Sequence, residues 1–531
     1  MVNSVRLSVG LILAAQLVHA FSVKSGLRPR QYNNQTQIEI EHQAKDDPIG
    51  ATKKVKKMPN LGTPGYDSFA KHIYGVHWVG EHSSQHQVPW FDNGKFPFTK
   101  PDPAERNADG GLTSVPKESN GFVLKDDLKL RGDAVQPYYI TKDYNPDDVK
   151  RAVIVFPGMP RDAWKWATLM QNAFDYVHTK RKYCYQKKDA IILSPLTLNQ
   201  QDSAAVQNHN WAIYKDSNWE VGGSTHSPDM PHGESYFTMI DKMIDMLLDK
   251  SKFPNLDKVV LAGHSMGAQA VQHYQLMRKT NKDQEDSIMW WIGNPGAWTW
   301  LNAGRPTYWP DCQDQMNIWP YGLNQTSKHV AYNMNAKEHK LVSAALKRET
   351  QIALGLDDNG EGNTHCEAFY QGANHLDRGS NYVLSVDGMG GLPSNYEVNY
   401  VAHVAHQDYP MYAANRSLDF IWGKHFNGDC SAKPPVTTTS TSSSTSTKSS
   451  STSTSTSSSS STSTKTSSSS TSTSSSKSSA KPTTITTSKS GSTTTVTATP
   501  TGAGQDCGNN DSKGGGICIS GSGNGNTIQI S

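Results

Sequence analysis

One serine of the chain has the sequence surroundings of an activated nucleophile. Residues 257–267 read Asp-Lys-Val-Val-Leu-Ala-Gly-His-Ser-Met-Gly, an apolar run that continues directly into a Gly-x-Ser-x-Gly motif. The run predicts a buried strand over residues 258–262 and then a sharp turn into a helix, which exposes the hydroxyl of Ser265. Gly263 and Gly267 lack the Cβ atoms that would collide where strand and helix approach each other. The alternative interpretation is a glycine-rich turn whose serine only caps the helix.

A serine hydroxyl is a poor nucleophile until a base accepts its proton and a third group orients that base. In a sheet with this kind of turn, the acid and then the histidine follow later strands. The last strong strand is predicted over residues 398–405, and His406 stands at its end, which makes His406 the favoured base. His403 is the alternative, but it lies inside the predicted strand, where its side chain would point into a face of the sheet.

The acid is expected just after the preceding strand, which is predicted over residues 351–354. The chain there reads Gly-Leu-Asp-Asp-Asn-Gly, so that Asp357 and Asp358 are neighbours in a turn. One carboxylate can face the histidine while the other caps the turn, and spacing alone does not choose between them. The sequence therefore predicts a Ser–His–Asp triad in which the choice of acid is open.

A developing oxyanion needs two N–H donors beside the nucleophile. The amide of Met266, directly after the serine, is the first candidate. The second should come from the turn after the strand predicted over residues 152–156. Both prolines of this turn lack an N–H group, which leaves Gly158 and Met159, and Met159 is favoured. Arg161, near the end of the turn, either braces it or begins the next helix.

The elements that must position these residues alternate between short apolar runs and amphipathic helices. Two early antiparallel strands are predicted over residues 121–131 and 134–143. Six further short runs, rich in branched residues, predict buried parallel strands: 152–156, 190–193, 258–262, 288–292, 351–354 and 398–405. Helices are predicted between them, among others over residues 162–180 and 235–250. This alternation predicts an α/β fold with a mostly parallel central sheet and helices on both faces.

Residues 297–345 interrupt this alternation with a segment rich in Trp, Tyr, Pro and Asn. The segment follows the strand predicted over residues 288–292, at the edge where such sheets bind their ligands. We therefore expect a cap-like insertion over the site, and an irregular surface loop is the alternative. Four tryptophans are expected either to line an apolar pocket or to pack inside the cap: Trp298, Trp300, Trp309 and Trp319.

The two ends of the 531-residue chain differ in composition from its middle. Residues 1–20 combine an early arginine, a short apolar core and a small-residue cleavage site, which predicts a signal peptide and a secreted, extracellular protein. The expected organisation continues with a polar, extended N-terminal arm or pro-region (21–65), an α/β domain (66–430), a disordered Ser/Thr-rich linker (431–505) and a short Gly/Cys tail (506–531).

Cysteines and sequons agree with export through an oxidising compartment. The chain has six cysteines, an even number, and four N-x-Ser/Thr sequons at Asn34, Asn324, Asn415 and Asn510. The cysteine spacings match no zinc pattern, and the predicted triad chemistry calls for neither a metal nor an organic cofactor. A net charge of +3 does not indicate a nucleic acid partner, and no apolar segment is long enough to span a bilayer. A glycosylated Ser/Thr-rich stalk is an expected means of association with a cell wall.

Several motifs together resemble the α/β-hydrolase superfamily and, more narrowly, a group of secreted fungal serine hydrolases of undefined substrate. The motifs are Phe156-Pro157-Gly158, Gly263-His264-Ser265-Met266-Gly267, Asn294-Pro295-Gly296, Gly355-Leu356-Asp357-Asp358, Cys366-Glu367-Ala368 and His406-Gln407-Asp408. The resemblance covers about residues 66–426 and implies the α/β-hydrolase fold. It also implies that Asp358 is the acid, that His406 is the base, and that Cys312 and Cys366 form a disulfide. The chain departs from many relatives by having Pro157-Gly158 where they have His-Gly before the oxyanion turn.

Residues and resemblance together predict a secreted serine hydrolase that cleaves an acyl bond, with a carboxylic ester as the expected substrate. The ester is expected to be a small molecule or derived from a polymer. One alternative is a serine peptidase or amidase, which uses the same triad. The other is a catalytically silent hydrolase fold that binds a partner.

Overall fold

The computed structural model describes residues 34–58, 99–228, 233–426, 428 and 430, together with four short strands near the C-terminus. The chain divides into two units, Met1–Ala432 and Lys433–Ser531. The predicted signal peptide (1–20), most of the Ser/Thr-rich linker (431–505), the sequon at Asn510 and the predicted start of the α/β domain at residue 66 lie outside the described residues.

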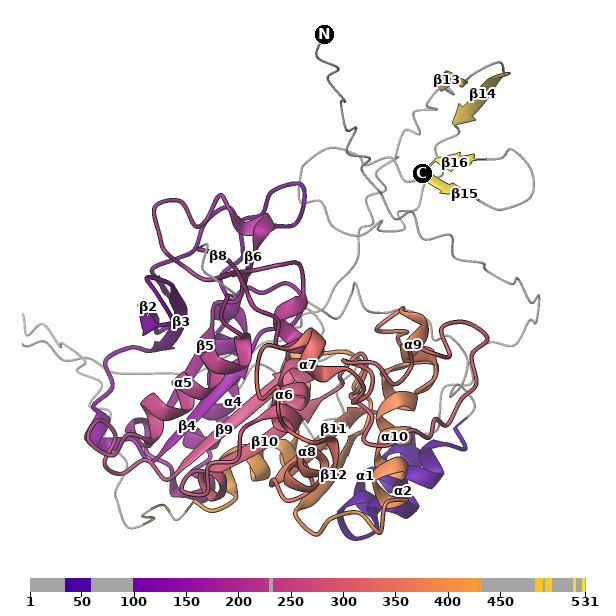
Figure 1. Cartoon of the computed structure of the whole chain (residues 1–531). Helices are drawn as coiled ribbons and strands as arrows, with labels where there is room; N and C mark the ends of the chain where they lie inside the picture. The colour runs from indigo at the N-terminus through magenta and orange to yellow at the C-terminus, as the bar shows by residue number, and fades with distance from the viewer. Residues whose placement is uncertain are drawn as a thin grey trace, which may run out of the picture. The chain divides into compact units, whose positions relative to one another are not determined.

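The first unit is built around a nine-stranded sheet in the order β1-β2-β3-β5-β4-β9-β10-β11-β12 (Figure 1). The strands from β5 to β12 in this order run parallel, and β1, β2 and β3 are antiparallel additions at one edge. The bounds are β1 Glu118–Ser119, β2 Phe122–Lys129, β3 Val135–Thr141, β4 Arg151–Phe156, β5 Ala190–Pro195, β9 Lys258–His264, β10 Ile288–Gly293, β11 Thr350–Gly355 and β12 Tyr396–Val401. The predicted mostly parallel sheet is confirmed.

Helices cover both faces because successive strand residues point into two separate cores. Ile154 and Leu261 pack with α5, α6, α8 and α10, whereas Val153 and Val260 pack with α4, α11 and α12. The bounds are α4 Ala163–Thr179, α5 Tyr236–Leu248, α6 Met266–Met277, α8 Glu338–Ala345, α10 His375–Asp387, α11 Asp408–Ala413 and α12 Asn415–Leu418. The strands are apolar on both faces, as a sheet with helices on both sides requires.

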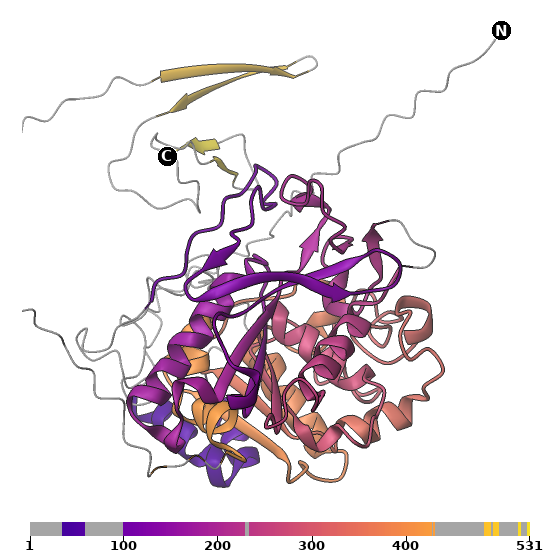
Figure 2. The ribbon, with the colours of Figure 1, turned by 90° about the vertical axis from the view of Figure 1, so that its left-hand side faces the viewer.

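Figure 2 looks at the edge of the sheet that β2 and β3 form. The register between these two strands shifts between Lys125 and Leu128, so that β2 contains an irregularity there. A separate three-stranded sheet contains β6 (Leu198–Asn199), β7 (Ile213–Tyr214) and β8 (Thr225–Ser227). The second unit contains two antiparallel strand pairs, β13 (Thr483–Lys489) with β14 (Ser492–Ala498) and β15 (Ile519–Gly521) with β16 (Ile528–Ile530).

The prediction of an extended N-terminal arm is wrong for residues 34–58, which form two helices, α1 (Asn34–Asp46) and α2 (Pro48–Val55). The Asp47 side chain accepts a hydrogen bond from the Gly50 amide at 2.8 Å and caps α2. Ile40 and Val55 are fully buried in the core that also contains β12. The segment has few apolar residues. Its helices form because these residues are buried against the rest of the fold. Figure 1 shows α1 and α2 beside α10 at the β12 edge.

One predicted strand end that bears on the site differs in the structure. The strand expected over residues 398–405 is β12 and ends at Val401, so that residues 402–405 form a turn between the strand and His406. The insertion at 297–345 contains the short helix α7 (Thr326–His329) and all of α8. Among the helices of the described part of the chain, none combines the length and hydropathy that a membrane span requires.

Candidate active site

Ser265 occupies a strained turn between β9 and α6. β9 ends at His264 and α6 begins at Met266, so that Ser265 alone forms the turn. Its backbone has φ 60° and ψ −128°, a conformation that is costly for a residue with a side chain. The Ser265 amide donates to the carbonyl of Gly293 at 2.9 Å and so holds the turn against the end of β10. The structure thus contains the predicted strand-to-helix turn.

The two glycines of the motif allow this turn because backbone atoms lie where their side chains would be. A Cβ on Gly263 would lie 2.2 Å from the carbonyl oxygen of Gly267. A Cβ on Gly267 would lie 2.4 Å from the carbonyl oxygen of Phe156, at the end of β4. Any larger residue at either position would therefore push α6 away from the sheet and displace the serine.

The structure brings His406 and Asp358 together. Nδ1 of His406 lies 2.7 Å from Oδ2 of Asp358, and the two side chains are 3% and 1% exposed. Asp358 lies in the turn after β11, and His406 follows the turn after β12. The short distance is typical of a hydrogen bond to a charged acceptor. With the proton on Nδ1 donated to the carboxylate, Nε2 of His406 is the nitrogen that can accept another proton.

The carboxyl group of Asp358 is held in its ionised form. Complete burial acts to raise its pKa, but His375 and His406 outweigh burial and keep the pKa of Asp358 well below its ordinary value. An ionised carboxylate here stabilises a positive charge on the neighbouring imidazole. The site can therefore hold a proton taken from a nucleophile.

Asp357 and His403, the alternative candidates for the acid and the base, have other surroundings than Asp358 and His406. Asp357 is exposed, and its Oδ1 accepts a hydrogen bond from Gln37 at 2.6 Å. His403 was expected inside the last strand, which is wrong: it lies two residues beyond Val401 with φ 57°. A hydrogen bond joins two of the candidates for acid and base, Asp358 and His406.

A second imidazole, which the sequence analysis missed, also faces Asp358. Nδ1 of His375 lies 2.9 Å from the carbonyl oxygen of Gly360 and 3.2 Å from Oδ1 of Asp358. The ring centroids of His375 and His406 are 4.1 Å apart. The one sequence signal for His375 is Asn374, whose side chain caps α10 and so places the histidine at the start of that helix. No spacing rule connects it to the triad.

Asp358, His375 and His406 also offer three potential metal-ligand atoms within 4.8 Å of one another. Both Nδ1 atoms face the carboxylate at 2.7 and 3.2 Å. Hydrogen bonding and ion pairing with Asp358 therefore account for the cluster without a metal ion.

A buried network joins the residue before Ser265 to the segment after His406. Nδ1 of His264 lies 2.7 Å from Oδ1 of Asp408, and Nζ of Lys165 lies 3.0 Å from Oδ2 of the same carboxylate. The ring of His264 lies 4.7 Å from the ring of His406. The network therefore fixes the turn at Ser265 against the segment that follows His406. Neither Lys165 nor the role of Asp408 was foreseen.

Asn294 determines the protonation of His264. Oδ1 of Asn294 accepts from the amide of Gly355 at 2.9 Å, so that Nδ2 is the atom that faces Nε2 of His264 at 3.2 Å. Nε2 of His264 is then an acceptor, and Nδ1 carries the proton that is donated to Asp408. Burial lowers the pKa of His264 below its ordinary value. A neutral ring at this position does not oppose a positive charge on His406.

The candidate oxyanion donors lie on two turns. Met266 N–H belongs to the first residue of α6, and Gly158 and Met159 lie in the turn after β4. Among hydrogen bonds between described residues, none uses the amide of Met159 or of Met266. Arg161 braces the β4 turn, because its Nη2 lies 2.9 Å from Oδ1 of the buried Asp202. Of the two proposed roles for Arg161, bracing is the one that is observed.

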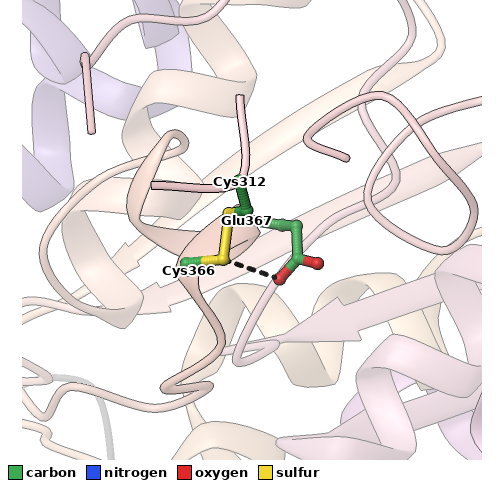
Figure 3. Close-up of side chains that lie close together, drawn as sticks. All are labelled: Cys312, Cys366 and Glu367. Carbon is green, nitrogen blue, oxygen red and sulfur yellow. Dashed lines mark hydrogen bonds between the residues drawn. A yellow bond between two sulfur atoms is a disulfide. The ribbon is translucent and has the colours of Figure 1, made fainter. Parts of the chain in front are cut away.

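Two disulfides link distant segments of the first unit. Cys312 and Cys366 are bonded, as the resemblance implies, and connect the insertion to the segment that follows the acid turn (Figure 3). The Glu367 carboxylate lies 3.6 Å from Sγ of Cys366, and the oxidised sulfurs are not thiolate ligands. The second disulfide joins Cys184 to Cys430, a pairing that the sequence left open.

Most tryptophans of the insertion pack in the interior. Trp298 and Trp300 are buried, and Trp298 stacks on Tyr382 with ring centroids 4.2 Å apart. Trp319 is also buried and donates its indole N–H to a carbonyl at 3.0 Å. Trp309, at 36% exposure, is the tryptophan of these four that reaches the surface. Packing thus accounts for three of the four tryptophans.

A buried carboxyl group near the start of α6 links stability to pH. Glu220 is 8% exposed, and its Oε2 accepts from Nε2 of Gln269 at 2.6 Å. Burial raises the pKa of Glu220 to about 8. Between about pH 4.3 and pH 8 the unfolded chain therefore binds fewer protons than the folded protein. Under these conditions, stability falls as pH rises.

We expect Glu220→Gln to remove this fall, because glutamine still accepts from Gln269 and does not ionise. The variant should gain stability over the wild type between pH 5 and pH 9, by at most about 5 kcal/mol. Chemical denaturation at pH 5, 7 and 9 measures the difference, with Glu118→Gln, on an exposed carboxylate, as the matched control. Parallel stability curves for wild type and Glu220→Gln would show that the carboxyl group titrates normally.

Comparisons with known proteins show likeness only to solved structures. No protein-family model and no curated protein matches the chain. Poly(aspartic acid) hydrolase-1 from Sphingomonas sp. KT-1 is similar with 17% identity and a TM-score of 0.38, over 57% of this chain and 98% of that one. The poly(3-hydroxybutyrate) depolymerase LpqC from Bordetella parapertussis is similar with 17% identity and a TM-score of 0.39, over 60% of this chain and 90% of that one. Esterase Est22 is similar with 12% identity and a TM-score of 0.31, over 59% of this chain and 80% of that one.

The strand order and the turn at Ser265 are by themselves those of an α/β-hydrolase fold.

Proposed function

We propose that the chain is a secreted serine hydrolase that cleaves a carboxylic ester. The observation that carries the proposal is the 2.7 Å contact between His406 and Asp358, at the sheet edge where Ser265 holds a strained turn. The ring contact between His264 and His406 supports the proposal, because His264 is the residue that precedes Ser265. A proton acceptor with an ionised partner is what a serine nucleophile requires.

In the proposed reaction Ser265 attacks the carbonyl carbon of the ester while His406 takes its proton. Asp358 keeps Nδ1 of His406 protonated and stabilises the imidazolium. The His406 proton then passes to the leaving alcohol, and the acyl group remains on Ser265. A water molecule, deprotonated by His406, releases the acid and restores the serine. The amides of Met266 and Met159 stabilise the oxyanion in both steps.

The surroundings of the second donor support an apolar contact with the substrate. Met159 is 43% exposed, although it lies on a braced turn beside buried residues. An exposed methionine next to an oxyanion donor suits an apolar acyl or alcohol group, since it is removed from water when the ester binds.

Labelling with a fluorophosphonate probe tests the proposal directly. We expect the full-length secreted protein to react with one equivalent of probe, and peptide mapping to locate the label on Ser265, because a triad serine attacks phosphorus as it attacks an acyl carbon. A series of simple esters of increasing chain length, run beside peptide and amide substrates, then distinguishes an esterase from a peptidase or amidase. A chain that resists the probe would be the silent binding protein of the second alternative.

A further inference from the structure

The helices α1 and α2 contact the two turns that carry the proposed acid and base. Gln37, in the first turn of α1, is 2% exposed. Its Nε2 donates to Oδ1 of Asp357 at 2.6 Å, and its Oε1 accepts from the amide of His403 at 2.6 Å. Asp357 is next to Asp358, and His403 is three residues before His406. One buried carboxamide therefore bonds both turns.

The two turns need such a bond because they are close to each other and irregular. The amide of Asp357 donates to the carbonyl of Val404 at 2.9 Å, so that the turns touch through their backbones. His403 has φ 57°, which is unfavourable for a residue with a side chain. The His403 amide donates to Gln37. One helical turn further along α1, the carboxylate of Glu41 accepts a hydrogen bond from the amide of Ala402 at 3.3 Å. Two side chains of α1 thus bind the backbone just after β12.

The second helix anchors this arrangement to the fold. Thr52 of α2 and Tyr400 of β12 are joined by a hydrogen bond of 3.0 Å between their hydroxyls. Lys56 forms an ion pair with Asp377 of α10, the helix that begins at His375. The helix pair is therefore bonded to three elements around Asp358: the acid turn, the base turn and the start of α10.

We propose that α1 and α2 are a retained part of the active enzyme and that Gln37 is a positioning residue, which fixes Asp358 relative to His406. The inference depends on the proposed function. It differs from the expectation that residues 21–65 are a pro-region, because removal of a pro-region would take Gln37 away. A misplacement of catalytic groups by about 1 Å can cost about 100-fold in rate.

A swap of hydrogen-bond polarity tests Gln37. Gln37→Glu keeps the acceptor for His403 but places a carboxylate against Asp357, and we expect kcat to fall 10- to 100-fold with KM within twofold of wild type. In the double variant Gln37→Glu/Asp357→Asn, the asparagine amide can donate to the new carboxylate, and kcat should return to within about threefold of the Asp357→Asn single variant. Glu39→Gln, at an exposed position of the same helix, is the matched control and should behave as wild type.

The readouts separate positioning from general loss of stability. A positioning role lowers kcat and the rate of fluorophosphonate labelling at temperatures where the variant melts cooperatively, and the double variant rescues both. Unchanged kcat in Gln37→Glu, or a change confined to KM, overturns the inference. If Gln37→Glu does not fold, Gln37→Met is judged by the same criteria. Failure of wild type itself to be labelled would instead overturn the proposed function.

The retained segment has an independent test in the mature protein. N-terminal sequencing of the active, secreted protein should find a start before Asn34. An active protein that begins after residue 58, without α1 and α2 bound to it, would contradict the proposal, since Gln37 would then be absent from the working enzyme.

Discussion

Under the proposed function, Ser265→Ala is expected to lower kcat for every hydrolysed ester by about 10⁶-fold, as loss of the nucleophile does in serine hydrolases. The expected effect is large because a water molecule that replaced the missing hydroxyl would not be held by the turn in the geometry needed for attack beside His406. Alanine has the same backbone preferences as serine at φ 60°, and the hydroxyl is the only group removed. We therefore expect the variant to fold with the stability of the wild type.

Purified wild type and variant should be compared by initial rates on a short-chain ester and by thermal melting. Ser251→Ala, on an exposed serine of the loop before β9, is the matched control and should retain full activity. Activity of Ser265→Ala within tenfold of the wild type would mean that another residue is the nucleophile.

Asp358→Asn is expected to lower kcat by about 10⁴-fold with a smaller change in KM. An asparagine amide can donate to Nδ1 of His406, which would place the proton on Nε2 and leave no acceptor for the serine. It also removes the negative charge that balances an imidazolium. Asp357→Asn, which keeps an acceptor for Gln37, is expected to cost less than threefold, and a reversal of these two effects would identify Asp357 as the acid.

The comparison of wild type with Asp358→Asn also gives a test of how stability depends on pH. The folded-state pKa of Asp358 is lowered, so that its ionised form adds stability at any pH above the unfolded value of about 3.9. This contribution is lost as the pH falls below that value toward the folded pKa. The stability difference between wild type and Asp358→Asn should accordingly shrink as the pH falls below about 4. A difference that instead grows with acidity would contradict an ionised Asp358.

Local sequence was enough to locate the nucleophile turn. The apolar run before Gly263 can only be buried as a strand of the sheet, and the two glycines are required by backbone atoms 2.2 and 2.4 Å from their missing side chains. Both constraints act between residues that are neighbours in sequence or in adjacent elements. The alternation of apolar runs and amphipathic helices likewise predicted the parallel sheet, because burial on both faces favours apolar residues at most positions of a strand.

The partners of the triad were predicted less completely. The strand order placed the acid and the base after β11 and β12, but the end of β12 at Val401 and the left-handed turn at His403 did not follow from the apolar pattern, which continues through residues 402–405. Asp357 and Asp358 have the same side chain and adjacent positions. Only the directions of their side chains, inward for Asp358 and outward for Asp357, tell them apart.

By itself the sequence determined the sheet, the turn at Ser265 and the two strand ends after which the proposed acid and base lie, because these depend on short-range periodicity and on steric limits of single residues. The tertiary structure alone decided which aspartate meets which histidine, that His375 and the pair His264–Asp408 surround the base, and that helix α1 bonds the turns of both. Those contacts join residues up to 366 positions apart in the chain. A polar residue such as Gln37 carries no periodic signal, and its partners are set by the packing of whole elements around it.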